Sequence, residues 1–87
     1  MVTRDVVIVN SVGLHSRPAS HFVREAQLYK SNISIEVEDR RVNAKSILGV
    51  LSLGIAQGMT ITLKAEGPDE DAAVERLAAY VASGLEE

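Results

Sequence analysis

The stretch Gly13-Leu14-His15-Ser16-Arg17-Pro18-Ala19-Ser20 marks the point where a first helix begins, and it organises the rest of the chain. Pro18 suits a first helical turn because its ring fixes φ near the helical value and its missing N–H costs nothing there. We expect Ser16 to be the N-cap residue, with His15 just outside the helix. A histidine, an arginine and unpaired backbone amides therefore meet at one helix N-terminus.

These neighbours can hold a phosphoryl group on a histidine. An unprotonated imidazole, which is common for histidine near neutral pH, can accept the group at His15. The free N–H groups of a helix start, here the amides of Ser16 and Arg17, stabilise the added negative charge. The Arg17 guanidinium supplies a cation with a fork geometry that matches phosphate oxygens. The alternative is that His15 is structural or merely exposed, and that Arg17 is simply solvated.

A second motif, Asn43-Ala44-Lys45-Ser46-Ile47-Leu48-Gly49-Val50-Leu51-Ser52-Leu53-Gly54, predicts a short helix that Ser46 opens and Gly54 closes. Its apolar residues lie almost all round a helix of about two turns, so one core can hardly bury them all. The residues that we expect on an exposed docking surface are Ile47, Leu48 and Leu51. Ordinary core packing is the alternative for these three, and it is what we expect for Val50 and Leu53.

Residues 13–19 and 43–54 together resemble the HPr family, the histidine-containing phosphocarrier proteins of the bacterial phosphoenolpyruvate-dependent sugar phosphotransferase system. The resemblance covers nearly the whole chain. It implies an α+β open-faced sandwich, in which a four-stranded antiparallel sheet is covered on one side by three helices in the order βαββαβα, as one domain over residues 1–87. It also implies that His15 accepts a phosphoryl group from enzyme I and passes it to enzyme IIA domains, with Arg17 assisting. Such a protein is a stoichiometric carrier and not an enzyme.

The Lys45-Ser46-Ile47 segment resembles the form of HPr that carries a regulatory serine. This implies phosphorylation of Ser46 by an ATP-dependent HPr kinase/phosphorylase and a link to a catabolite-control transcription regulator. A phosphate there would meet the favourable end of a helix dipole and add negative charge beside a docking surface. Two features depart from the family pattern: Ser16 stands where alanine is usual, and the turn over residues 38–41 lacks a glycine.

Two other functional classes stay open at this point. One is a regulatory binding module that acts in catabolite repression or in a non-sugar phosphorelay, with His15 secondary to Ser46. The retained histidine at position 15 favours the carrier over this module. The other is a small α+β ligand-binding domain without phosphate chemistry, which would require both motifs to be coincidental.

Composition agrees with a small carrier. The 87 residues, of which 46% are hydrophobic, support one modest core. The chain has no cysteine, which excludes disulfides and thiolate metal sites, and nothing completes a metal-ligand set around His15 and His21. We find no leader pattern and no run near the roughly 20 apolar residues that cross a bilayer. We therefore expect a cytoplasmic monomer with no cofactor and no membrane insertion.

Charge is distributed unevenly along the chain. Residues 1–46 hold seven Lys and Arg against five Asp and Glu, a net +2, whereas residues 47–87 hold two against seven, a net −5. The histidine motif lies in the basic half, which suits acidic protein partners. An overall net charge of −3 with three aromatic residues argues against nucleic-acid binding.

The first helix has a polar stripe beside the histidine. Arg17, Ser20, His21 and Arg24 follow the i, i+3, i+4, i+7 spacing of one helix face. We expect Ser20 and Arg24 to contact partners. The alternative, favoured for Ser20 and His21, is the solvated side of an amphipathic helix.

Periodicity predicts the remaining elements. Strands are expected over residues 6–9, 33–37, 41–43 and 60–65, where apolar residues run together or alternate. The first helix should bury a face that consists of Ala19, Phe22, Val23 and Ala26. A last helix, opened by Pro68-Asp69 and ended near Gly84, should bury Ala73, Val74, Leu77, Tyr80 and Val81.

Overall fold

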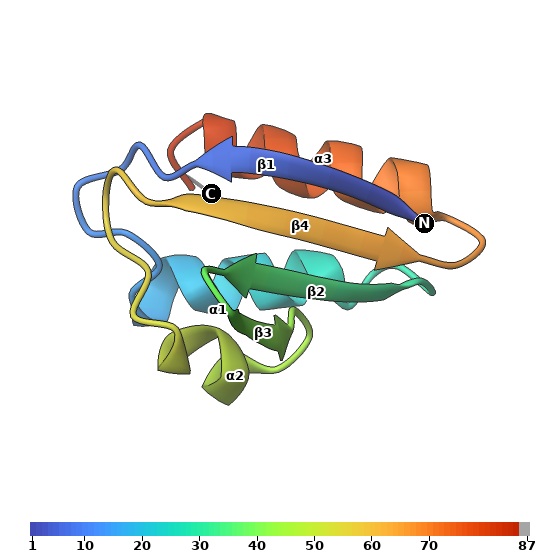
Figure 1. The fold of residues 1–87 in the computed structure, drawn as a ribbon, viewed down its shortest axis with the longest axis horizontal. Coiled ribbons are helices and arrows are strands. Elements are labelled where there is room, and N and C mark those ends of the chain that lie inside the picture. The colour runs from blue at the N-terminus through green and yellow to red at the C-terminus, as the bar shows by residue number, and fades with distance from the viewer. Residues whose placement is uncertain (86–87) are drawn as a thin grey trace.

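A computed structural model describes residues 1–85 as a four-stranded sheet with three helices (Figure 1). In chain order the elements are β1 (Val2–Val7), α1 (Ser16–Ala26), β2 (Asn32–Val37), β3 (Arg40–Asn43), α2 (Ile47–Ser52), β4 (Thr60–Glu66) and α3 (Glu70–Ala82). This is the βαββαβα order that the resemblance implied.

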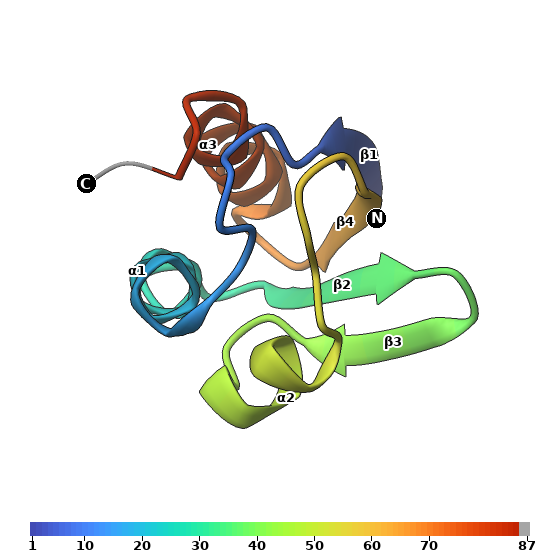
Figure 2. The same cartoon turned by 90° about the vertical axis from the view of Figure 1, so that its left-hand side faces the viewer.

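The strands form one antiparallel sheet in the spatial order β1-β4-β2-β3, so that the last strand in the chain occupies a central position. Turning the molecule shows α1 and α3 together on one side of the sheet, while the opposite face stays open (Figure 2). The short helix α2 packs against α1 and β3 at the edge of the sheet. Val42 of β3 approaches the Gly49 position of α2. The predicted open-faced sandwich is confirmed.

Strict alternation explains the central strands. Ile33, Ile35 and Val37 of β2 are buried, and Ile61, Leu63 and Ala65 of β4 repeat the pattern. The residues between them face the open side and are polar, as expected when one sheet face is packed and the other is solvated.

The first strand differs from its sequence prediction. We expected it over residues 6–9, but β1 runs from Val2 to Val7. Ile8 has left the strand, although it still exchanges hydrogen bonds with residues 58 and 59. It is only 1% exposed, so its apolar character reflects core packing and not a place in the strand. An edge strand with one buried face can carry polar residues, and these residues obscured the start of the strand in the sequence pattern.

The two long helices bury the faces that periodicity predicted. The buried residues of α1 are Ala19, Phe22, Val23 and Ala26. The buried residues of α3 are Ala73, Val74, Leu77, Ala78 and Val81, while Tyr80 is half-buried. Among the described residues, no helix combines the length and apolarity that crossing a membrane requires.

One polar network ties the connection between α1 and β2 to the start of α3. The Asp69 carboxylate accepts hydrogen bonds from the backbone N–H groups of Lys30 and Ser31, both at 2.9 Å, and from the Ser31 hydroxyl at 2.5 Å. These bonds, led by the one from the Ser31 hydroxyl, lower the pKa of Asp69 to about 2. The network joins the segment that leads into β2 to the start of α3.

Candidate functional site

Helix α1 begins one residue earlier than we predicted. Its N-cap is His15, with extended backbone angles of φ −76° and ψ −177°, and Ser16 is the first helical residue. The prediction that Ser16 caps the helix is therefore wrong. The His15 carbonyl already accepts the first intrahelical bond, from the Ala19 N–H at 2.8 Å, and no side chain caps this start. The N-cap is the last residue whose backbone is not helical. A side chain with good capping chemistry at the next position does not change which residue that is.

The uncapped start leaves backbone donors free. Within residues 1–85, the N–H groups of Ser16 and Arg17 have no protein acceptor, and Pro18 has no N–H to satisfy. The first turn of α1 holds no acidic residue that would compete for an anion. Two amides directly after His15 can therefore donate to negative oxygens carried on its ring.

Two arginines add positive charge to this side of α1. Arg17 and Arg24 are exposed, and neither has an ion-pair partner in the part of the chain that the structure describes. Ser20 and His21 lie between them on the helix and are half-buried. The predicted stripe exists on the surface of α1, whereas its role in binding is untested.

The loop before α1 is held in a tight contact. Gly13 has φ +64°, and a side chain there would collide with the Ile55 carbonyl and come within 2.9 Å of the Ala56 Cα. The Leu14 N–H donates to the same Ile55 carbonyl at 3.1 Å, and Leu14 itself is 3% exposed. Glycine is required here by both the positive φ and the close backbone approach. The anchored loop leaves the next residue, His15, exposed.

A hollow of about 450 Å³ lies beside His15 and connects it to α2. It is lined by Ser11, Val12, Leu14, His15, Leu51, Gly54, Ile55 and Ala56. The sequence predicts Leu51 at a docking surface, but it does not indicate the loop over residues 54–56 or Val12, which is 54% exposed. The glycines at positions 13 and 54, both with positive φ, were the available signals that two loops meet here.

The α2 helix presents the apolar surface that its sequence predicted. Ile47, Leu48 and Leu51 are 36%, 79% and 38% exposed, whereas Val50 and Leu53 are buried. Ser46 is the N-cap, and its Oγ accepts a hydrogen bond from the Gly49 N–H at 3.2 Å. Both predictions about the structure of this segment are confirmed, and its function as a docking surface remains a prediction.

Two hydrogen bonds of Lys45, which sequence reasoning missed, connect the segment before α2 to the end of α1 and the residues that follow it. The Gln27 side chain donates to the Lys45 carbonyl at 3.1 Å, and the Lys45 ammonium donates to the Tyr29 carbonyl at 2.7 Å. Periodicity within one segment carries no information about such a contact between segments. These two hydrogen bonds set where Ser46 lies relative to α1.

The whole arrangement suits transient attachment of an anionic group to the His15 ring. The ring is accessible, two amides and a guanidinium follow it, and an apolar hollow adjoins it. Among residues 1–85, no group of three or more His, Cys, Asp or Glu side chains is placed to hold a metal ion.

Comparison with known proteins relates this arrangement to one family. The family model described as "PTS HPr component phosphorylation site" matches residues 2–83. The chain is 46% identical over 81 residues to the HPr-like protein Crh of Bacillus subtilis, covering 93% of this chain and 95% of Crh. It is 48% identical over 77 residues to the phosphocarrier protein HPr of Buchnera aphidicola, covering 88% and 91% of the two chains.

A solved structure agrees with the sequence matches. The crystal structure of HPr-C-His from Thermoanaerobacter tengcongensis superimposes with a TM-score of 0.96 at 43% identity, covering 100% of this chain and 99% of the other. Sequence and fold therefore indicate the same family over nearly the full chain.

Proposed function

This chain belongs to the HPr family of phosphocarriers, and we propose that it carries a phosphoryl group on His15 from enzyme I to enzyme IIA domains during sugar uptake. It takes part stoichiometrically and is not an enzyme. The observation that carries the proposal is the exposed His15 at a helix start whose next two amides are unoccupied.

The chemistry requires little of the protein. A lone pair on one His15 ring nitrogen attacks the phosphorus of the donor, a P–N bond forms, and the bond from phosphorus to the donor breaks. The reverse sequence passes the group to the acceptor. The amides of Ser16 and Arg17 and the Arg17 guanidinium stabilise the phosphoryl oxygens without a metal or cofactor on this chain.

Donor and acceptor dock in turn on the same surface, because both must reach one histidine. We assign that surface to Ile47, Leu48 and Leu51 with the hollow beside His15, bordered by Ser20 and Arg24 on α1. Its apolar centre and basic border suit partners with a complementary acidic rim.

Ser46 regulates this docking in the proposal. Phosphorylation by an HPr kinase/phosphorylase adds negative charge at the start of α2, roughly 8 Å along the helix axis from Leu51. That distance is about one Debye length at physiological ionic strength, so the charge acts on the docking surface.

The deciding experiment is intact mass after incubation with phosphoenolpyruvate, magnesium and a bacterial enzyme I. We expect one added phosphate that mild acid removes, because phosphohistidine is acid-labile whereas phosphoserine is not. His15→Ala should take up none and still fold, since His15 lies outside the core. Ser46→Ala is the matched control and should be labelled normally.

Two outcomes would sink the carrier proposal. One is an unlabelled protein beside an active control carrier. The other is acid-stable labelling that survives in His15→Ala. Loss of folding in His15→Ala would instead make this residue structural.

The second candidate is a regulatory module in catabolite repression. It is favoured by the Crh relative and by an exposed apolar surface next to Ser46. In that case the Ser46-phosphorylated form binds a catabolite-control transcription regulator, whether or not His15 is present. Binding measured with wild type and His15→Ala, each with and without phosphate on Ser46, separates the two functions.

We also propose that the protein works as a cytoplasmic monomer that neither binds nucleic acid nor inserts into membranes. A dimer is the alternative, because a structure of the same fold is described as an HPr dimer from Thermoanaerobacter tengcongensis. Light scattering at increasing protein concentration distinguishes the two states.

A further inference from the structure

The open face of the sheet contains a second hollow, which the carrier proposal does not use. It has a volume of about 210 Å³ and lies over β2, β3 and β4. Ser34 sits in the middle of it: the register places Ser34 opposite Asn43 on one side and Lys64 on the other. A small side chain between longer ones leaves the space.

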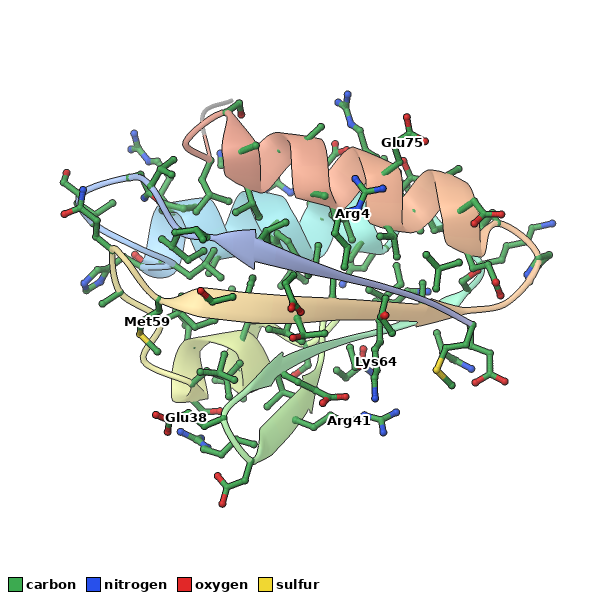
Figure 3. The ribbon with its side chains drawn as sticks, turned by 45° about the horizontal axis from the view of Figure 1, so that its top comes forward. Arg4, Glu38, Arg41, Met59, Lys64 and Glu75 are labelled. Atoms are coloured by element: carbon green, nitrogen blue, oxygen red, sulfur yellow. The ribbon has the colours of Figure 1, made fainter. Side chains whose placement is uncertain are left out.

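The charge around this hollow is predominantly positive. Arg41, Lys45 and Lys64 line it, against one carboxylate, Glu66. Figure 3 labels Arg41 and Lys64, which extend from different strands toward the same part of the open face.

Arg41 is the available cation of this group. Its partner in the register is Glu36, but the Glu36 carboxylate pairs with the Lys64 ammonium at 2.7 Å. Within residues 1–85 the Arg41 guanidinium makes no hydrogen bond or ion pair. A planar guanidinium with all its donors unused is suited to phosphate oxygens.

Neighbouring polar groups are already oriented. The Asn43 Oδ1 accepts the Lys45 N–H at 2.9 Å, which leaves the amide NH₂ of Asn43 as a donor. Lys45 is held in place because its ammonium donates to the Tyr29 carbonyl at 2.7 Å. The Asn43 NH₂ is therefore a pre-positioned donor, which lowers the cost of ordering side chains around a ligand, whereas the Lys45 ammonium already has an acceptor.

The hollow also has two chemically different ends. Arg41 lies one row from Ser34 in the register, and Asn32 and Glu66 form the row on the other side. The first end offers cationic donors, whereas the second offers an amide and a carboxylate, which suit hydroxyl groups.

We propose that this hollow binds a small phosphate ester that carries hydroxyl groups, with its phosphate at Arg41, Ser34 and Asn43 and its hydroxyls toward Glu66 and Asn32. The volume of about 210 Å³ falls below the roughly 300 Å³ at which sites for drug-sized ligands begin, which suits a small ester. The site is independent of His15, since none of its lining residues borders the hollow beside that histidine.

The test is a titration of ¹⁵N-labelled protein with glycerol 3-phosphate at constant ionic strength, followed by amide chemical shifts. We expect saturable shifts at Ser34, Asn43 and Lys64 that glycerol and sodium chloride do not produce. Inorganic phosphate should bind the same amides more weakly, because it cannot reach Glu66 and Asn32. Shifts at residues 16 and 17 report separately on the start of α1.

Two variants probe the assignment. Arg41→Gln should raise the dissociation constant about tenfold by removing a charge-assisted contact. Ser34→Leu should abolish binding by filling the hollow. Arg4→Gln is the matched control, because Arg4 belongs to β1 and does not line the hollow.

Shifts that are linear in concentration and equal to those with sodium chloride would overturn the site. Saturable shifts that persist in both Arg41→Gln and Ser34→Leu would do the same. Equal affinity for inorganic phosphate would overturn the assignment of the hydroxyl end.

Discussion

Helices α1 and α2 both begin after a residue with extended backbone, but they differ in whether a side chain accepts a hydrogen bond from their first N–H groups. His15 caps α1 by position alone, and within residues 1–85 no side chain bonds to the amides of Ser16 and Arg17. Ser46 caps α2 with its own Oγ, which accepts the Gly49 N–H at 3.2 Å. Neither helix has an acidic residue in its first turn.

In the proposed function, the difference separates two kinds of phosphorylation site. At His15 the unused amides could bind a phosphate carried on the ring, which would stabilise transfer directly. At Ser46 the hydroxyl already accepts the Gly49 N–H, so a phosphate there would have to replace an existing hydrogen bond. An uncapped helix start costs some stability, and we attribute its presence at α1 to phosphate binding.

Removing the cation at the uncapped start of α1 should have the largest effect. Arg17→Gln should lower the rate of phosphoryl transfer to His15 about tenfold to hundredfold, because a charge-assisted contact to the phosphate is lost. Rapid-quench kinetics with phosphorylated enzyme I below saturation would measure this. Arg24→Gln, on the same exposed face, should change the rate only a few-fold; equal effects would make both arginines docking residues.

Adding charge at the capped start tests whether α2 acts on the docking surface. Ser46→Asp should slow transfer from enzyme I by roughly threefold to tenfold, through charge at the interface. Ser46→Asn retains a capping side chain without the charge and should transfer at the wild-type rate. An unchanged rate for Ser46→Asp, measured with the donor well below saturation, would remove the regulatory claim.

The free energy of unfolding should show which helix start has a side chain that caps its N–H groups. Ser46→Ala should lower the free energy of unfolding by about 1 kcal/mol, the usual cost of a lost N-cap. Ser16→Ala should change it by less than about 0.5 kcal/mol, because Ser16 is exposed and caps nothing. Urea unfolding monitored by circular dichroism gives both values, and a larger loss for Ser16→Ala would reverse the assignment of the caps.

The start of α3 extends the comparison and has the smallest expected effect at neutral pH. Asp69 is its N-cap residue but bonds across to residues 30 and 31, which lowers its pKa from 3.8 to about 2. A depressed folded-state pKa stabilises the protein above the unfolded pKa, and this stability is lost as pH falls from about 4 to 2.

Urea midpoints measured across this pH range test the assignment. Asp69→Asn should flatten the slope, because an amide cannot titrate. Asp71→Asn should retain it, since Asp71 makes none of the bonds to residues 30 and 31. An unchanged slope in Asp69→Asn would show that other carboxylates cause the acid sensitivity.

Most of the local structure could be predicted from the sequence alone. Apolar spacing located the buried faces of α1 and α3, alternation located β2 and β4, and the surplus of apolar residues in α2 predicted which three would stay exposed. These features depend on neighbours within one element, where period and burial are directly linked. The two motifs were enough to indicate the family.

The way in which distant segments meet could be seen only in the folded molecule. In the structure the N-cap of α1 is His15 and not Ser16, and residues 54–56 lie beside the histidine. Lys45 is hydrogen-bonded to Tyr29, and Asp69 to Ser31. The three contacts join residues from different segments, and the pattern within a single segment does not encode them. The position of the cap depends on where the backbone becomes helical, and not on which residue has the better capping side chain. The hollow over Ser34 likewise exists because strand register sets its neighbours.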